Sequence, residues 1–330
     1  MFTYKSPIKV RSKIAVIGAG PSGLKASGVL ASAGCEVDVY DANPEPGGLL
    51  IFGIPSFRFP KFKVMEGIDK LRELGVEFKV KSKVDGTELG RLIADYDALL
   101  ICTGTWKARR LRIEGEGLKG VYYAFEYLFK RALFERGYLN RAELPALGDK
   151  VAVIGGGLTA IDASLSALRD GAEEVYLLYR RTRKYAPAGE REFKRAEREG
   201  VKVVELVVPR SIVGKCKVEG VEVVNVELGE PDESGRPKPF EVSGTEHVIE
   251  VDSVLIAIGE LPTPPPSIEK IGIKVESDGR IAVDSKHMTT RRGVFAAGDV
   301  VLGPSKIGLA LKDGLEAALS TLRYLSEGRV

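Results

Sequence analysis

The chain has 330 residues, of which 44% are hydrophobic and 29% are charged. This length accommodates two fused nucleotide-binding folds but is short for three domains. Its 49 Lys and Arg residues nearly balance 46 Asp and Glu residues, so the net charge of +3 gives no reason to expect nucleic acid or an acidic membrane as a partner. No apolar run reaches the roughly 18 residues that a membrane span needs, and the N-terminus lacks a signal-peptide pattern, which favours a cytoplasmic protein.

The three cysteines, Cys35, Cys102 and Cys216, lie far apart along the chain. This spacing excludes a CxxC redox pair and a self-contained iron–sulfur cluster, so lone thiols are the default interpretation. His247 and His287 are interpreted as ordinary polar residues, and no metal site is expected. The absence of glutamine and the presence of only three asparagines favour a source that grows at high temperature.

The first glycine-rich segment follows a predicted strand at residues 13–17 and reads GAGPSG at 18–23. An amphipathic helix is expected to follow, up to about residue 33. A second predicted strand, 37–40, ends at Asp41, which lies 23 residues after the first glycine of the segment. This order of strand, glycine turn, helix, strand and acid is typical of a dinucleotide-binding fold and disfavours a purely structural glycine turn.

The glycines of this segment have separate physical roles. Gly18 permits the tight turn, Gly20 lets the backbone approach a pyrophosphate, and Gly23 allows the helix to pack closely on the strand. The start of the helix attracts the negative charge of the phosphates. A carboxylate at the position of Asp41 suits the hydroxyls of a ribose.

The same pattern returns in the second half of the chain. A predicted strand at 150–154 leads into GGGLTA at 155–160, and a helix at 161–170 and a strand at 175–179 are expected to follow. The chain is therefore predicted to contain two dinucleotide sites.

Tyr179 has, in this second copy, the position that Asp41 has in the first, and Arg180 and Arg181 follow it. A ribose-binding acid is thus replaced by cations that suit the 2′-phosphate of NADPH. The second site is predicted to prefer NADPH, with NADH also possible. The alternative is that these arginines belong to a solvated strand end.

Two further segments favour FAD at the first site. The sequence PGGL at 46–49 provides a flexible backbone loop after the predicted acid. The sequence VFAAGD at 294–299 is predicted to be a strand that delivers Gly298 for close approach and Asp299 for ribityl hydroxyls.

Ser305 is expected to cap a helix that continues through Leu325. The N-terminal amides of this helix would face the pyrimidine end of a flavin, where negative charge builds up on reduction.

Taken together and in this order, the segments resemble the glutamate synthase small-subunit family of flavoproteins, which also covers the flavin subunits of NADH-dependent ferredoxin:NADP oxidoreductases. The resemblance spans nearly the whole chain and rests on VIGAGPSGLKAS, PEPGGLLIFGIPSFRFPK, ICTGTWKARRLRIEGE, VAVIGGGLTAIDAS, VYLLYRRTRKYAPAG, VLIAIGELP and GVFAAGDVVLGPS. It implies an FAD-dependent NAD(P)H oxidoreductase in which residues 103–104 and 258–259 mark the crossings between two domains.

Carried over by position, the resemblance implies contacts to FAD from Gly18, Gly20, Pro21, Ser22, Gly23, Asp41, Gly48, Leu49, Val84, Thr103, Gly104, Gly298 and Asp299. It implies contacts to NADPH from Gly155, Gly157, Leu158, Thr159, Arg180, Arg181 and Glu190.

The sequence departs from this family in two respects. Members of the glutamate synthase type carry an N-terminal cysteine-rich iron–sulfur domain, whereas this chain begins about a dozen residues before its first predicted strand. Lys306 stands where the family often has a small neutral residue. It is interpreted either as a solvated lysine or as a cation that faces the flavin and raises its reduction potential.

The expected fold class is α/β, with two Rossmann-like dinucleotide-binding domains and the NAD(P)H domain inserted into the FAD domain. The FAD domain is predicted at 1–106 and 263–330, and the NAD(P)H domain at 107–262. Within the NAD(P)H domain, the segments 205–226 and 248–258 are expected to form strands that look more antiparallel than those of a Rossmann-like sheet. Residues 231–239, between these segments, are predicted to be a loop.

Hydride transfer from nicotinamide C4 to flavin N5 needs no protein acid or base, so no catalytic side chain is expected. Three hypotheses compete for the second half-reaction. The first is electron transfer to a partner protein, such as ferredoxin or an iron–sulfur or synthase subunit. The second is a free-standing NAD(P)H oxidoreductase for polysulfide, a quinone or oxygen, and the third is a non-catalytic nucleotide-binding scaffold. A homo-oligomer is compatible with all three.

Overall fold

The computed structural model describes residues 1–4, 6–232 and 235–328. The chain divides into two compact units. Unit 1 consists of Met1–Lys107 and Glu260–Val330, and unit 2 consists of Ala108–Gly259. Unit 2 is therefore inserted, in sequence, between the two segments of unit 1.

Unit 1 contains a five-stranded parallel sheet with the order β16-β4-β1-β2-β3. Its strands are short and mostly buried, as expected for a sheet with helices on both faces. They are β1 (Lys13–Ile17), β2 (Glu36–Tyr40), β3 (Val76–Lys79), β4 (Ala98–Ile101) and β16 (Val294–Ala296). A separate two-stranded sheet pairs β5 (Thr105–Ala108) with β15 (Glu260–Pro262).

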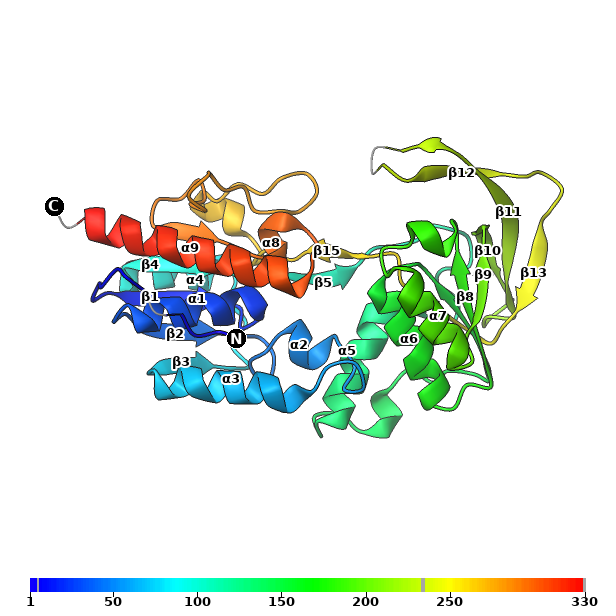
Figure 1. Ribbon diagram of the computed structural model, residues 1–330, viewed down its shortest axis with the longest axis horizontal. Coiled ribbons are helices and arrows are strands. Elements are labelled where there is room, and N and C mark those ends of the chain that lie inside the picture. Colours follow the sequence, from blue (N-terminus) through cyan, green and yellow to red (C-terminus); the bar gives the residue numbers. More distant parts are fainter. Residues whose placement is uncertain (5, 233–234, 329–330) are drawn as a thin grey trace. The chain divides into compact units, whose positions relative to one another are not determined.

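The helices of unit 1 connect these strands and cover the sheet (Figure 1). They are α1 (Pro21–Ser32), α2 (Leu49–Phe52), α3 (Lys61–Glu73), α4 (Gly86–Asp95), α8 (Asp299–Leu302), α9 (Ile307–Glu327) and the 3-10 turn η3 (Ile268–Ile271). The long C-terminal helix α9 packs directly on α1, although nearly 300 residues separate their starts in sequence. Gly314 makes this approach possible, because a Cβ atom there would lie 2.3 Å from the backbone oxygen of Ser22.

Unit 2 repeats this plan. Its five-stranded parallel sheet has the order β6-β14-β7-β8-β9. The strands are β6 (Val121–Tyr123), β7 (Lys150–Ile154), β8 (Glu174–Tyr179), β9 (Lys202–Glu205) and β14 (Ser253–Ile256). The helical elements are α5 (Ala124–Glu135), η1 (Arg141–Glu143), α6 (Leu158–Arg169), η2 (Arg183–Tyr185) and α7 (Glu190–Arg198).

A four-stranded antiparallel sheet completes unit 2. It contains β10 (Val207–Val213), β11 (Gly220–Pro231), β12 (Pro237–Glu241) and β13 (His247–Glu250), with β11 pairing to each of the other three. The prediction for this region was partly wrong. The expected loop at 231–239 is shorter, because β12 begins at Pro237 and pairs with β11, and β14 belongs to the parallel sheet beside β7.

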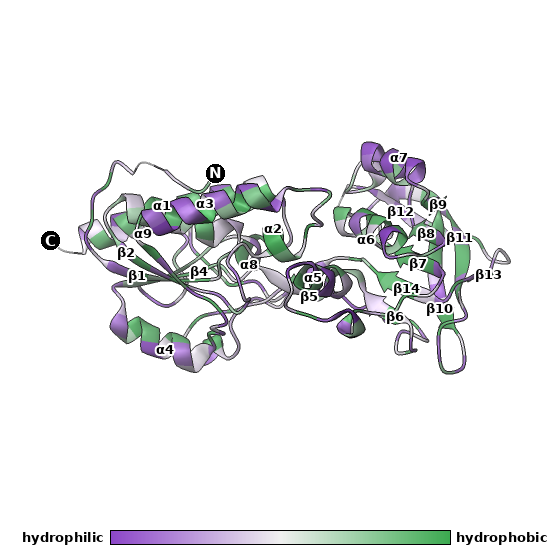
Figure 2. Cartoon of the chain, turned by 90° about the horizontal axis from the view of Figure 1, so that it is seen from below, coloured by the Kyte–Doolittle hydropathy of each residue, from purple (hydrophilic) through white to green (hydrophobic). Residues whose placement is uncertain are grey.

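Hydropathy explains why these elements form layers. The central strands β1, β4, β7 and β14 are mostly apolar, whereas helices such as α3 and α4 carry an apolar stripe on one side and polar residues on the other (Figure 2). Fully buried strand residues, including Ile14, Val16, Val151 and Val153, form the centre of each unit. Two parallel α/β folds, one inserted into the other in sequence, confirm the expected fold class.

The start of α9 differs from the prediction. Lys306, and not Ser305, occupies the cap position, and the Ser305 hydroxyl instead donates a hydrogen bond of 2.6 Å to Oδ1 of Asp299. Lys306 itself is exposed. In the described part of the chain, no helix combines the length and the apolar character that a bilayer crossing requires.

The contact between α1 and α9 yields a stability prediction. Gly314→Ala places a methyl group against the backbone of α1, so we expect a loss of about 1–3 kcal/mol in the free energy of unfolding. Gly308→Ala, in the same helix, meets no described atom within 4 Å and should leave stability unchanged or raise it by up to about 1 kcal/mol. Urea unfolding followed by circular dichroism measures both. Equal midpoints for the two variants would contradict the proposed packing.

Candidate functional site

The strand register of unit 1 brings distant segments together at one edge of its sheet. Ile17 pairs with Tyr40 on one side and with Ile101 on the other, and Ile101 pairs with Ala296. Because all these strands are parallel, their carboxyl ends meet at the same edge, which is where open α/β sheets bind ligands. The segments that follow these strand ends contain Gly18, Asp41, Thr103 and Gly298.

The glycine-rich turn after β1 is shaped by close backbone approach. A Cβ atom at Gly18, whose φ is +108°, would lie 2.3 Å from the backbone oxygen of Cys102. A Cβ atom at Gly23 would lie 1.9 Å from the backbone oxygen of Gly18. At Gly20, by contrast, a Cβ atom would meet no described atom within 4 Å. Gly20 therefore faces open space at the start of α1, where the backbone N–H groups can bind an anion.

Two further features shape this anion site. Pro21 and Ser22 are the first two residues of α1, and a proline at the first position is preorganised for the helix. The loop that contains Gly48 lies against the glycine turn, since a Cβ atom at Gly48 would lie 2.6 Å from Cα of Gly20. Leu49, half-buried, begins α2 directly after it.

Asp41 follows β2 and is almost fully buried. Its Oδ2 accepts a hydrogen bond of 2.6 Å from the backbone N–H of Ala19, and its Oδ1 accepts one of 2.8 Å from that of Asn43. Burial raises the pKa of Asp41, and the two backbone N–H groups oppose that shift. The carboxylate thus braces the glycine turn, and its contact with a ribose stays a prediction.

Gly298 and Asp299 follow β16. The N–H of Gly298, whose φ is +78°, donates a hydrogen bond of 2.6 Å to Oδ2 of Asp313. The other oxygen of Asp313 lies 3.0 Å from Nε2 of His287, and this contact raises the pKa of the imidazole. Burial raises the pKa of Asp299.

Sequence analysis missed Asp313. A usable signal existed, because this acid occupies the buried face of α9 between Ala310 and Ala317, where apolar residues are expected. Asp313, His287 and Glu316 each also place one possible ligand atom within 4.8 Å of the others. The expectation of no metal site therefore stays a prediction.

The side chain of Thr103 gives the most direct indication that this edge of the sheet can bind a polar ligand. Its Oγ1 is buried, yet it has no hydrogen-bond partner among the described residues. A buried hydroxyl without a partner is costly and calls for an explanation, which a bound polar ligand would supply. The neighbouring Gly104 has a φ of +72°, and its carbonyl accepts the N–H of Thr263 at 2.9 Å. The open start of α1 and the unpartnered hydroxyl of Thr103 both fit a dinucleotide such as FAD.

Val84, an implied FAD contact, belongs to a buried hydrophobic cluster of unit 1. It also lines a surface groove of about 320 Å³, together with Tyr40 and Asp85. Because Tyr40 directly precedes Asp41, this groove lies beside the strand end where a ribose is expected.

The parallel sheet of unit 2 has the same arrangement at its carboxyl edge. Ile154 pairs with Leu178 and with Ile256, so the carboxyl ends of β7, β8 and β14 meet. A Cβ atom at Gly155 would lie 2.2 Å from the backbone oxygen of Ala257, whereas one at Gly157 would meet no described atom within 4 Å. As in unit 1, the first glycine of the turn lies close to the backbone after a neighbouring strand, and the glycine at the start of the helix has open space beside it. Leu158, which is exposed, and Thr159, which is half-buried, form the first turn of α6.

The end of β8 is where the two units differ. Tyr179 replaces the acid, and its ring lies over Gly156, where a Cβ atom would be 2.2 Å from Cε2 of the ring. Arg180 is exposed and makes no hydrogen bond or ion pair with the described residues. Glu190, the first residue of α7, is also exposed and lies 3.4 Å from Lys194.

Arg181 has a different environment from that expected. Its side chain is only 2% exposed, and its Nη2 lies 2.6 Å from Oδ2 of Asp232. Its Nε donates a hydrogen bond of 2.6 Å to the carbonyl of Pro237. A buried guanidinium held by a carboxylate and a carbonyl has a structural role, and the expected contact of Arg181 with NADPH stays a prediction.

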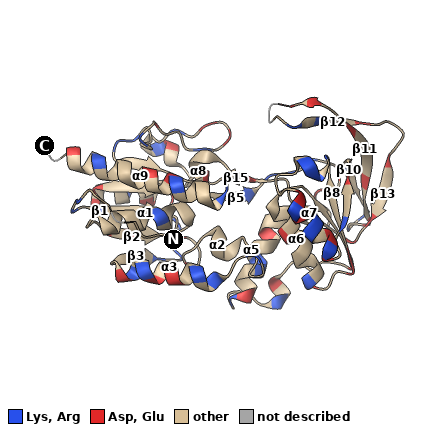
Figure 3. Cartoon of the chain, viewed as in Figure 1, with Lys and Arg blue, Asp and Glu red and all other residues tan. Residues whose placement is uncertain are grey.

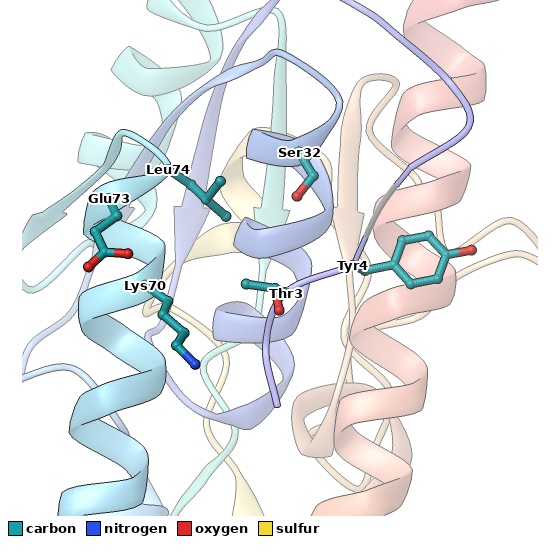
Figure 4. A pocket seen from close by; sticks show the side chains of 6 residues that line it. All are labelled: Thr3, Tyr4, Ser32, Lys70, Glu73 and Leu74. Atoms are coloured by element: carbon teal, nitrogen blue, oxygen red, sulfur yellow. The ribbon is translucent and has the colours of Figure 1, made fainter.

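A further groove lies elsewhere in unit 1. It has a volume of about 620 Å³ and is lined by Thr3, Tyr4, Ser32, Lys70, Glu73 and Leu74 (Figure 4). Ser32 ends α1, and the eleven-residue separation from Pro21 corresponds to about 16 Å of helix. This groove is therefore remote from the glycine turn and belongs to the opposite end of the helix.

Comparisons with known proteins agree with this geometry. Residues 12–314 match the pyridine nucleotide-disulphide oxidoreductase family. The chain is 38% identical to the glutamate synthase [NADPH] small chain of Halomonas elongata, covering 95% of this chain and 68% of that protein. It is 40% identical to the NADP(+)-dependent formate dehydrogenase subunit beta of Moorella thermoacetica, covering 96% of this chain and 44% of that protein.

Among solved structures, FprA from Mycobacterium tuberculosis in complex with NADPH superposes with a TM-score of 0.81 at 20% identity, covering 97% of this chain and 86% of that chain. At this identity the likeness concerns the fold alone. The prediction of a source that grows at high temperature finds no support in these comparisons. The family match and the extent of the similarity show that this chain belongs to the pyridine nucleotide-disulphide oxidoreductase family, within which it resembles the glutamate synthase small chains and is an FAD-dependent NAD(P)H oxidoreductase.

Proposed function

We propose that unit 1 binds FAD, that unit 2 binds NADPH, and that the chain passes electrons from NADPH through FAD to a partner protein. The observation that carries this assignment is the repeated glycine turn at the carboxyl edge of each parallel sheet. Asp41 follows β2 in one copy, whereas Tyr179 ends β8 and Arg180 follows it in the other. In sequence terms the assignment places FAD at 1–106 and 263–330 and NADPH at 107–262.

The residues of unit 1 would hold FAD in complementary ways. The N–H groups at the start of α1 would receive the pyrophosphate, and Gly20 would leave room for it. The Thr103 hydroxyl would find its partner on the ligand, and Asp299 would bind ribityl hydroxyls. FAD, when bound, supplies the capacity to accept a hydride and to release single electrons. No side chain is needed as an acid or a base, so positioning is the protein's contribution.

The residues of unit 2 would hold NADPH in a parallel manner. The start of α6 would receive its pyrophosphate, and the exposed Arg180 would bind the 2′-phosphate. The relatives named above support a preference for NADPH, since their names specify NADPH or NADP(+).

The positions of the cysteines favour direct electron transfer from the flavin to a partner. Cys35 and Cys102 are buried free thiols in unit 1, and Cys216 is an exposed free thiol in unit 2. The chain therefore has neither a CxxC dithiol nor the clustered thiolates that an iron–sulfur cluster needs. Both relatives named above are subunits or chains of larger enzymes, which supports a partner such as ferredoxin or an iron–sulfur subunit. The second candidate is a free-standing oxidoreductase for a small acceptor.

Flavin retention tests the assignment of unit 1. The purified chain, reconstituted with FAD and desalted, should be yellow and carry about one FAD. Thr103→Val removes a hydroxyl that has no partner among the described residues, so we expect equal or higher stability of the FAD-free chain but about twofold to tenfold weaker FAD binding. Ser166→Ala, which removes the unpartnered buried hydroxyl of α6, is the matched control and should bind FAD normally. A colourless reconstituted wild type would overturn the flavin assignment.

Anaerobic stopped-flow spectroscopy tests the direction of electron flow. NADPH should bleach the flavin absorbance faster than the chain turns over with oxygen, and an added ferredoxin or iron–sulfur partner should restore the yellow colour rapidly. Efficient turnover with polysulfide or a quinone, without any partner, would instead favour the second candidate.

Cofactor discrimination tests the role of Arg180. Its loss removes a charge-assisted hydrogen bond to the 2′-phosphate, so the ratio of kcat/KM for NADPH over NADH should fall by roughly 10- to 150-fold. Arg210→Ala removes an exposed arginine that pairs with Glu241 in the antiparallel sheet and should leave the ratio unchanged. If Arg180→Ala also leaves the ratio unchanged, Arg180 is an ordinary surface residue.

A further inference from the structure

A buried carboxylate on α9 lies beside the Gly298–Asp299 turn of unit 1. Helix α9 carries charged residues of both signs along its length (Figure 3), and all of them except Asp313 are exposed. Asp313 is only 8% exposed, although burying a charged side chain is costly unless hydrogen bonds or an opposite charge compensate it. Its two carboxylate oxygens therefore need donors, and each of them has one.

One oxygen of Asp313 holds the turn at the edge where FAD is expected. Its Oδ2 accepts the N–H of Gly298 at 2.6 Å, and the φ of this glycine is +78°. A Cβ atom at Gly298 would lie 2.7 Å from Cβ of Ser22, so the turn lies directly against the first turn of α1. Asp313 therefore fixes the backbone from which Asp299, the next residue, would reach the ribityl hydroxyls.

The other oxygen of Asp313 is held by His287. Nε2 of the imidazole lies 3.0 Å from Oδ1. An ionised carboxylate only accepts hydrogen bonds, so Nε2 carries a proton in the neutral ring as well as in the charged one. The hydrogen bond with Asp313 raises the pKa of His287, and burial opposes this shift. Of the residues that the structure describes, His287 alone forms an ion pair with Asp313.

The backbone of His287 has a defined position as well. Its φ of +61° is left-handed, a conformation that residues other than glycine rarely adopt. Its N–H donates to the carbonyl of Asp284 at 3.0 Å, and its own carbonyl accepts the N–H of Ala296, the last residue of β16, at 3.0 Å. His287 is therefore attached to the strand that leads into the turn, and its ring reaches from there to α9.

The contacts of this cluster favour a hydrogen-bonded pair over a metal site. Glu316 completes the set of three possible ligands, but it is exposed and its carboxylate lies 3.7 Å from Nζ of Lys312. Both oxygens of Asp313 already accept a hydrogen bond, so a metal ion would have to displace a donor. The N–H of Gly298 and the ring of His287 thus account for the environment of this carboxylate without an ion.

We propose that His287 is a positioning residue of the flavin site. Through Asp313 it holds the N–H of Gly298 and so keeps the Gly298–Asp299 turn in the conformation that binds FAD. Without the ring, the carboxylate is free to rotate away from the turn, and FAD must then order the turn as it binds, which lowers its affinity. The inference rests on the proposed assignment of FAD to unit 1 and adds to that site a residue that need not touch the flavin.

Titration of the FAD-free chain with FAD, followed by flavin fluorescence in a buffer that contains EDTA, tests this role. His287→Asn tolerates the left-handed backbone but is too short to reach Asp313, so FAD binding should weaken by about threefold to tenfold. His287→Gln brings an N–H donor back to the longer reach and should recover part of the loss. His247→Asn changes the other histidine, which is exposed in β13 of unit 2, and as the matched control it should bind FAD as the wild type does.

A double-mutant cycle separates positioning through Asp313 from a general effect of His287 on folding. Asp313→Ala removes the acceptor of the Gly298 N–H, so FAD binding should weaken by about tenfold or more. In that background His287→Asn should cause no further loss, because the residue through which His287 acts is gone. Equal losses in both backgrounds would overturn the positioning role. If circular dichroism shows that Asp313→Ala does not fold, the isosteric Asp313→Asn replaces it in the cycle.

The outcomes distinguish this inference from the assignment on which it rests. A wild type that binds no FAD, with or without EDTA, would refute the flavin site of unit 1. A wild type that binds FAD, together with a His287→Asn variant that binds it equally well, would refute the role of His287 alone. A wild type that binds FAD only when EDTA is absent would show that a metal ion holds this cluster, and would overturn the inference as well.

Discussion

Both units depend on helix starts whose backbone N–H groups have no side chain to cap them. Gly20 and Gly157 stand at the cap positions of α1 and α6, and a glycine cannot supply the oxygen that a serine or aspartate would. The uncapped amides and the helix dipole favour an anion at these points. The parallel register then brings the other strand ends to the same edge, so the anion site becomes the anchor of a complete nucleotide site.

Supporting contacts keep this edge in shape before any ligand arrives. Asp41 binds two backbone N–H groups of neighbouring loops, and Asp313 binds the N–H of Gly298. In each case a buried carboxylate accepts a backbone donor that would otherwise be unsatisfied. The same supporting role appears in unit 2 with opposite charge, where Arg181 ties the β11–β12 hairpin to the end of β8. Buried charged residues therefore hold the loops, and exposed ones are left for the ligand.

Local patterns in the sequence were enough to predict the repeated strand, glycine turn and helix, because each of these signals lies within about thirty residues and reflects one backbone requirement. Strand β7 begins and ends where the prediction placed it, and the parallel α/β class followed from the repeat. Contacts between distant segments could not be predicted in this way. Nothing local to Arg181 indicates that it would be buried against Asp232, and nothing local to Ser305 indicates that it would bond to Asp299 and leave the cap of α9 to Lys306.

The cysteines of this chain do not provide the dithiol chemistry that the name of its family describes. A disulphide oxidoreductase relays electrons through a pair of neighbouring thiols, and the nucleophile of such a pair must reach the thiolate form. Here burial raises the pKa of Cys102 to about 12, and Cys35 donates its S–H to the carbonyl of Val10. Cys102 therefore stays a neutral thiol at physiological pH, and its position behind the glycine turn makes it part of the packing of Gly18. Because the chain contains no pair of neighbouring thiols, a flavin held at this edge would have to transfer its electrons directly to an external acceptor. The protein surface around the flavin, and not a redox pair within the chain, would then select that acceptor.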